Sequence, residues 1–252
     1  MVTKSFLIII ILISGIFNNN ALAEVSINGT RIIFNAKDNE SRIQLKNNGK
    51  SPYLLQLWID DGNPKARPGE SNVPFLINPP VIRIDPEKGQ AIHITAPSIT
   101  LPQEKESLFW FNMLEIPPKS TATDASTNQL QLALRTRVKL FYRPNNLIPE
   151  PVEAYKNLTF SLNENILSVK NPSPYYITFS KIEIRKSKNT KILGSVEKFP
   201  EHMIAPNGEM KLPLTIKEPS EINKANLFYN VINDFGGETI NKKPLDSIIN
   251  IN

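Results

Sequence analysis

The sequence has no cysteine and only two histidines, and each shortage excludes a class of structure or chemistry. Without cysteine there is no disulfide, no thiolate nucleophile and no cysteine metal ligand, so the fold must be held together by packing alone. His93 and His202 lie far apart and have no partner at metal-ligand spacing. We therefore expect neither a metal site nor a metal-dependent activity.

Catalytic motifs are also missing. The chain contains no Gly-x-Ser-x-Gly, no His-Glu-x-x-His and no glycine-rich phosphate loop. Glycosidase chemistry on paired carboxylates requires no such motif, but no feature of the sequence indicates it. We therefore expect no catalytic residue and no cofactor.

The net charge is mildly positive, with 29 Lys and Arg against 24 Asp and Glu. The basic residues do not form a block interleaved with aromatic residues, which is the pattern typical of a nucleic-acid surface. We interpret them as a solubilising surface that happens to be basic, and we expect no nucleic-acid partner.

The first 23 residues have the features of a secretory signal peptide. Lys4 gives a positive start, residues 6–17 form an apolar run, and residues 21–23 (Ala-Leu-Ala) form a small-x-small cleavage site. The run is shorter than the roughly 20 residues that a membrane span needs, although an uncleaved anchor helix is the alternative. We expect cleavage after Ala23, a mature chain that begins at Glu24, and no stable membrane insertion.

The rest of the chain alternates short apolar runs with turn residues, the pattern of a β-sandwich. In the first half we expect strands over residues 25–28, 31–34, 42–45, 54–59, 81–84, 91–95, 108–112 and 130–142. In the second half we expect them over residues 158–162, 166–169, 175–184, 210–216, 227–232 and 238–240. A proline-rich stretch at 144–151 is typical of a linker, so we expect an all-β protein with domains at 24–143 and 152–252.

Six short segments then occur in a recognisable order. They are NGTRIIF at 28–34, PPVIR at 79–83, ESLFWFNMLEIPP at 106–118, KLFYRP at 139–144, NPSPYY at 171–176 and INDFGG at 232–237. In this order and spacing the chain resembles the PapD-like periplasmic chaperones of the chaperone–usher pilus pathway. The resemblance implies two immunoglobulin-like β-sandwich domains in tandem, set at an angle with a cleft between them, in a periplasmic protein that is not an enzyme.

The resemblance also implies how such a protein works. It would bind pilin or fimbrial subunits by donating a β-strand to their incomplete sandwich and would deliver them to an outer-membrane usher. The family places its donor leucines at Leu130, Leu132 and Leu134, which point to one face of a strand because they are two apart. The alternative is that these leucines face the domain's own core. The eleven-residue loop at 119–129 is similar to that of the short-loop subclass.

Two further groups of residues match the family's charged sites. Arg31 and Lys139 resemble the pair that grips the subunit's C-terminal carboxylate, with Thr30 as a further contact. Leu134 and Lys139 differ by an odd number, so an unbroken strand would place them on opposite faces.

Glu106, Arg143 and Asp234 resemble a charge network between the family's domains, where two carboxylates flank one arginine. Taken alone, all five charged residues of these two groups would be read as solvated surface charges. An exported fibre subunit or adhesin is the alternative function. Gel filtration discriminates the two functions, because a subunit polymerises whereas a chaperone elutes as a monomer or small dimer.

The signal peptide generates the first prediction. The exported protein should leave cells on osmotic shock and should begin at Glu24, because cleavage follows a small-x-small sequence. N-terminal sequencing checks this, and a chain in the membrane fraction that still begins at Met1 would contradict it.

Overall fold

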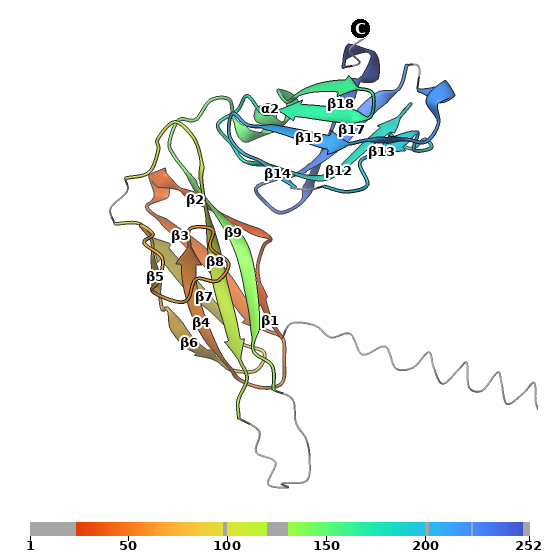
Figure 1. The fold of residues 1–252 in the computed structure, drawn as a ribbon. Coiled ribbons are helices and arrows are strands. Elements are labelled where there is room, and N and C mark those ends of the chain that lie inside the picture. Colours follow the sequence, from red (N-terminus) through yellow and green to blue (C-terminus); the bar gives the residue numbers. More distant parts are fainter. Residues whose placement is uncertain (1–23, 98–99, 120–130, 200–201, 223, 249–252) are drawn as a thin grey trace, which may run out of the picture.

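The computed structural model describes residues 24–97, 100–119, 131–199, 202–222 and 224–248. These residues form two β-sandwiches joined end to end, with their long axes at an angle to each other (Figure 1). The predicted all-β fold with two sandwiches in tandem is confirmed. The predicted signal peptide and most of the predicted loop at 119–129 lie outside the described residues.

The first sandwich is formed by two sheets. One contains, in spatial order, β1 (Val25–Ile27), β3 (Glu40–Asn47), β7 (Gly89–Thr95) and β5 (Leu76–Asn78). The other contains β2 (Arg31–Asn35), β9 (Leu134–Arg143), β8 (Ser107–Ile116), β4 (Tyr53–Asp60) and β6 (Val81–Ile84). A short 3-10 helix, Ala36–Asp38, follows β2.

The second sandwich also has two sheets. One contains β10 (Thr159–Asn163), β11 (Ile166–Lys170) and β15 (Glu209–Pro213). The other contains β16 (Thr215–Ile216), β13 (Gly194–Ser195), β12 (Ile177–Arg185), β17 (Asn226–Ile232) and β18 (Glu238–Pro244), with β14 (Met203–Ile204) paired to β12. The helical segments are α2 (Pro151–Lys156) and two 3-10 helices, Pro219–Glu221 and Leu245–Ser247.

Each sandwich has its own hydrophobic core, because alternate residues of strands such as β3 and β17 face inward. Phe34, Phe111 and Leu140 are fully buried in the first core. Phe179 and Tyr229 are buried in the second. The two buried clusters share no residue, so each domain is stabilised by its own packing.

The strand predicted over residues 130–142 begins later than expected, and this part of the prediction is wrong. The ladder of β9 with β8 starts where Leu134 pairs with Glu115, and residues 131–133 are not in a strand. The physical reason lies opposite them, because β8 ends at Ile116 and is followed by Pro117 and Pro118, which have no N–H to donate. Leu130 lies outside the described residues.

Two features of the second domain also differ from the sequence prediction. The apolar run at 210–216 is divided between the two sheets, because β15 pairs with β11 whereas β16 pairs with β13. No helix was expected, yet α2 begins at the last residue of the proline-rich stretch 144–151. Its first residue is Pro151. Proline suits this position because an N–H there would have no acceptor within the helix, and because the fixed φ of proline fits the first turn.

None of the described helices is long and apolar enough to cross a membrane.

The separate cores generate the second prediction. Substituting Leu140, which is fully buried, by Ala should destabilise the first domain by about 2–5 kcal/mol through lost burial and a cavity. Both tryptophans of the chain, Trp58 and Trp110, lie in the first domain, so denaturant unfolding followed by tryptophan fluorescence reports on that domain alone. Leu76→Ala is the control, since Leu76 is 60% exposed and its loss should change the unfolding free energy by less than about 0.5 kcal/mol. Equal effects of the two substitutions would contradict the assignment of the core.

Candidate functional site

Strand β9 has neighbours on both sides along only part of its length. It pairs with β8 from Leu134 to Tyr142, but β2 pairs with it in parallel only from Lys139 to Arg143. No described strand covers the other edge of β9 between Leu134 and Val138. The backbone groups on that edge are therefore open to a further strand.

The leucines at the start of this edge are exposed. Leu132 is 62% exposed and Leu134 is 49% exposed. Leu134 has the same phase on β9 as Val138, Leu140 and Tyr142, which are buried in the core. The apolar face of β9 therefore continues past the end of the domain's own core. The alternative was that these leucines face the domain's own core, but neither Leu132 nor Leu134 is buried there.

Arg31 and Lys139 lie side by side at the joint between the domains. They are partners in the parallel ladder of β2 and β9, and Arg31 Nη1 donates a hydrogen bond to the carbonyl oxygen of Ile232 in the second domain at 3.0 Å. Lys139 is five residues from Leu134 in an unbroken strand, so the two side chains lie on opposite faces. The structure thus brings Arg31 and Lys139 together and separates them from the leucines.

The two cations have no anionic partner in the part of the chain that the structure describes. Among the described residues neither forms an ion pair, and the Nε of Arg31 is buried without a hydrogen-bond partner. Burial lowers the pKa of Arg31, and burial together with the charge of Arg31 lowers the pKa of Lys139. Two partly buried like charges side by side favour an anion between them.

Glu106, Arg143 and Asp234 form one contiguous network across the joint. Arg143 donates to Glu106 Oε1 at 2.8 Å and to both carboxylate oxygens of Asp234 at 2.6 and 2.9 Å. Glu106 and Arg143 belong to the first domain, whereas Asp234 lies in the turn between β17 and β18. The backbone N–H of Tyr176 also donates to Glu106, at 2.8 Å, so Glu106 itself contacts both domains.

Burial governs the electrostatics of this network. The side chain of Glu106 is only 2% exposed, and burial raises its pKa although Arg143 acts in the opposite direction. Burial alone would lower the pKa of Arg143, but the hydrogen bonds and charges of Asp234 and Glu106 raise it above its ordinary value. The guanidinium also lies over the ring of Tyr175, 5.1 Å from its centroid. Arg143 therefore stays charged and is held from both domains.

Thr30 contacts the second domain through a glycine. Gly236 lies in the same turn as Asp234, with φ of +81°, and a Cβ added to it would meet Thr30 Oγ1 at 2.8 Å. Only glycine combines this backbone conformation with so close an approach. Thr30 therefore takes part in the joint, next to Arg31.

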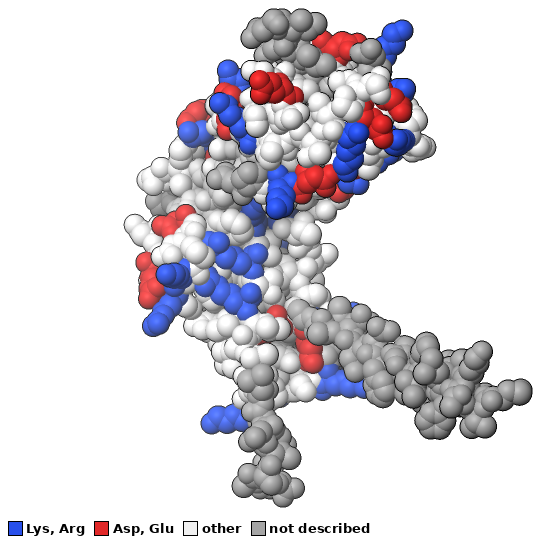
Figure 2. Space-filling model, turned by 45° about the vertical axis from the view of Figure 1, so that its right-hand side comes forward, with Lys and Arg blue, Asp and Glu red and all other residues white. Residues whose placement is uncertain are grey.

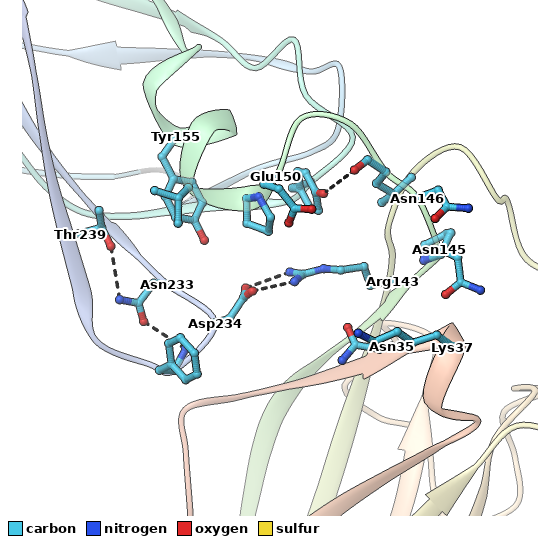
Figure 3. Close-up of a pocket in the computed structure, with 16 residues that line it drawn as sticks. Asn35, Lys37, Arg143, Asn145, Asn146, Glu150, Tyr155, Asn233, Asp234 and Thr239 are labelled. Carbon is cyan, nitrogen blue, oxygen red and sulfur yellow. Dashed lines mark hydrogen bonds and ion pairs between the residues drawn. The ribbon is translucent and has the colours of Figure 1, made fainter.

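A pocket of about 750 Å³ lies beside the charge network, as Figure 3 shows. Arg143 and Asp234 meet in it, Asn35 and Lys37 lie on the side of the first domain, and Tyr155 lies on the side of the second. Neither Arg31 nor Lys139 lines this pocket. The open volume at the joint is therefore separate from Arg31 and Lys139.

The outer face of the β9 sheet holds charged residues that the sequence analysis missed. Arg135 lies over the ring of Trp58 at 4.7 Å, and Arg137 lies over that of Trp110 at 4.1 Å. Arg137 also donates to the fully buried carboxylate of Asp60, from Nε to Oδ2 at 3.1 Å. The alternation of cations at 135, 137 and 139 was the only signal for this face. These contacts fix the side chains next to Lys139.

Charges of both signs are interspersed over the visible face of the second domain (Figure 2). The ion pairs of this domain include Lys186–Glu221, Lys191–Glu218 and Lys217–Glu197. Mixed charges of this kind are typical of a solubilising surface. No described group of three or more His, Cys, Asp and Glu side chains is arranged to hold a metal ion.

Comparison with known proteins matches both domains to one family. Residues 24–148 match the family described as pili and flagellar-assembly chaperone, PapD N-terminal domain, and residues 153–243 match its C-terminal domain. The chaperone protein FimB/FhaD of Bordetella pertussis is 40% identical over 224 residues, which cover 87% of this chain and 87% of the relative. The probable fimbrial chaperone YadV of Escherichia coli K12 is 39% identical over 227 residues, covering 88% of this chain and 89% of the relative.

The fold agrees with the sequence matches. The crystal structure of the Pseudomonas aeruginosa CupB2 chaperone superimposes with a TM-score of 0.70 at 32% identity, covering 87% of this chain and all of that one. Fold and comparisons together define a fimbrial chaperone built from two immunoglobulin-like domains. The chain belongs to the PapD family of pilus-assembly chaperones. The predicted resemblance and fold class are thereby confirmed.

The charge network generates the third prediction. Arg143→Ala should destabilise the protein by about 3–5 kcal/mol, because it leaves the buried carboxylate of Glu106 without its cation. It should also broaden the range of angles between the domains, because Asp234 loses its bidentate partner. Urea unfolding and small-angle X-ray scattering measure the two effects.

Arg83→Ala is the matched control for the network. Arg83 pairs with Asp85, but the two side chains are 71% and 60% exposed, so the cost should stay below about 1 kcal/mol. A scattering profile and unfolding curve of Arg143→Ala that match those of Arg83→Ala would show that the network does not hold the joint.

Proposed function

We propose that this chaperone binds pilin subunits by donating the open edge of β9 to their incomplete sandwich. The observation that carries the proposal is the combination of an uncovered strand edge with two exposed leucines at its start, Leu134 on β9 and Leu132 just before it. A strand that pairs with Leu134–Val138 gains main-chain hydrogen bonds, and the leucines supply side chains for its groove.

The leucines give the binding its apolar component. Leu132 and Leu134 are exposed in the free chaperone, and each contributes about 1.5–3 kcal/mol when it becomes fully buried in a partner. Leu130 precedes Leu132 by two residues. The same spacing assigns it to the same face of the donated strand. Soluble proteins rarely leave such a stripe exposed without a binding role.

Arg31 and Lys139 anchor the subunit's C-terminal carboxylate in this proposal. Among the described residues, no anion pairs with these two adjacent cations, and the buried Nε of Arg31 has no hydrogen-bond partner. A carboxylate would complete such a site. The anchor also sets the register, because a slip of one residue would turn every side chain of the paired strand to the opposite face. Thr30 adds a polar group beside Arg31.

The network of Glu106, Arg143 and Asp234 orients the two domains so that the anchor faces the partner strand. Its role is structural, since buried ion pairs stabilise little but are costly to break. We assign no catalytic residue to it, and none to the rest of the chain. Family membership supports this, because the matched relatives are chaperones.

Location and delivery complete the proposal. The chaperone acts in the periplasm after removal of residues 1–23, with residues 144–151 as the linker between its domains, and it passes subunits to an outer-membrane usher. The named fimbrial chaperones among its relatives support this placement. Family membership does not favour the alternative of a fibre subunit or adhesin.

The anchor generates the fourth prediction. Lys139→Met keeps the aliphatic stem and removes the charge, so the fold should remain while capture of a co-expressed pilin subunit is lost. Arg31→Ala should also abolish capture. Because it loses the hydrogen bond to Ile232 as well, circular dichroism must show that this variant is folded. Co-purification of subunit from the periplasm measures capture, and Lys170→Met, an exposed lysine of the second domain, is the control.

The leucine stripe is tested in the same assay. Leu132→Glu should abolish capture by a different route, because it forces a carboxylate into an apolar groove at a cost of several kcal/mol. Leu76→Glu is the matched control, since Leu76 is 60% exposed on a different sheet. A subunit that lacks its last residues should escape capture by the parental chaperone, just as a complete subunit should escape capture by the anchor variants. Parental yields from Lys139→Met and Leu132→Glu would refute strand donation for this chain.

A further inference from the structure

A buried carboxylate lies at the end of the first domain furthest from the joint. Phe109, Phe111 and Met113 face the core from alternate positions of β8, and the next residue in this phase is Glu115. Glu115 is only 2% exposed, and its neighbours across the sheet are Leu55 and Leu134. An acidic residue thus occupies a core position directly beside the first leucine of β9.

Only half of this carboxylate is satisfied. Oε2 accepts a hydrogen bond from the backbone N–H of Val25 at 3.1 Å, whereas Oε1 is buried and has no hydrogen-bond partner among the described residues. A buried carboxylate normally has its partners, because leaving one without them costs considerable free energy. The position of Glu115 therefore indicates a cationic partner that the described side chains do not supply.

The surroundings of Glu115 are acidic. Glu24 lies next to it, with Oε2 also buried and unpartnered and packed so closely on Gly49 that a Cβ there would meet it at 2.1 Å. Burial and the charge of Glu24 raise the pKa of Glu115, and burial and a hydrogen bond to Glu24 raise the pKa of Tyr53. Among the described residues no Lys, Arg or His forms an ion pair with either carboxylate. Two carboxylates and a phenol thus lie together, with no positive charge paired to them among the described residues.

We propose that the α-ammonium group created by cleavage before Glu24 is the missing partner, and that it forms an ion pair with Glu115. The nitrogen of Glu24 lies within about 3.6 Å of the nitrogen of Val25, which itself donates to Glu115. In the uncleaved chain this nitrogen is a neutral amide with one proton. After cleavage it is an ammonium with three donors and an ordinary pKa of about 7.7–8.0.

The ion pair links processing to the structure of the binding edge. Residues 25–27 form β1, which pairs with β3, while Glu115 lies in the opposite sheet next to Leu134. The new N-terminus therefore joins the two sheets of the sandwich beside Leu134, where the open edge of β9 begins. The first domain reaches its full stability only after cleavage. This inference rests on the proposed cleavage site and not on subunit binding.

The test compares two chains, both released from a fusion partner so that neither depends on the signal peptide. One begins at Glu24 and the other carries Gly-Ser-Gly before Glu24. In the first chain the α-amine should titrate about one unit above its ordinary pKa, as measured by the pH dependence of its acylation rate. The extension should lower the melting temperature of the first domain by about 2–5 °C, followed by tryptophan fluorescence.

Glu115→Gln gives the decisive control, because it keeps the shape and removes the charge. In this background the amine should titrate at its ordinary pKa, and the extension should no longer lower the melting temperature. Glu104→Gln, an exposed carboxylate of the same domain, should retain both effects.

An ordinary amine pKa in the chain that begins at Glu24, or an equal effect of the extension with Glu115→Gln, would overturn the inference. So would an exported protein whose N-terminus is not Glu24. None of these measurements uses a subunit, so they stand apart from the test of strand donation.

Discussion

The incomplete pairing of β9 is the constraint on which the rest of the structure depends. One strand serves two purposes along its length: from Lys139 to Arg143 it is an inner strand between β2 and β8, and from Leu134 to Val138 it is an edge. An exposed edge with apolar side chains normally leads to aggregation, and a soluble protein must control it. Here the open part is short, and Arg135 and Arg137 are held on its outer face by Trp58 and Trp110. The open edge is therefore limited to Leu134–Val138, and it offers a partner strand a single register.

The joint between the domains divides its charges into two groups with different physical consequences. Arg143 has carboxylates from both domains, so its energy depends on the angle between them. Among the described residues Arg31 and Lys139 form no ion pair. Burial lowers the pKa of Arg31, and burial together with the charge of Arg31 lowers the pKa of Lys139. A carboxylate bound there would remove this penalty, which is the physical basis for proposing Arg31 and Lys139 as the anchor of an anionic chain end. In the proposed function, the charge network fixes the joint, and Arg31 and Lys139 at that joint bind the carboxylate.

The sequence predicted what depends on local pattern, and it could not predict what depends on register. Alternation identified strands such as β6, and the order of short motifs identified the family. The start of β9 was predicted four residues too early. The ladder between β8 and β9 ends because of the two prolines that follow β8, and the sequence of β9 itself gives no sign of this end. The burial of Asp60 and its contact with Arg137 needed the pairing of β4, β8 and β9. Glu115 did carry a signal, since a glutamate stands in the core phase of β8 after three apolar residues.

Hydrogen exchange of the β9 amides tests the central claim most directly. Amides between Leu134 and Val138 that point away from β8 should exchange rapidly in the free chaperone and become strongly protected when a pilin subunit is bound. Amides between Lys139 and Arg143 are already covered by β2 and should change little. Binding of a subunit without new protection at Leu134–Val138 would contradict the account, because the partner would then be held by a surface other than the open edge.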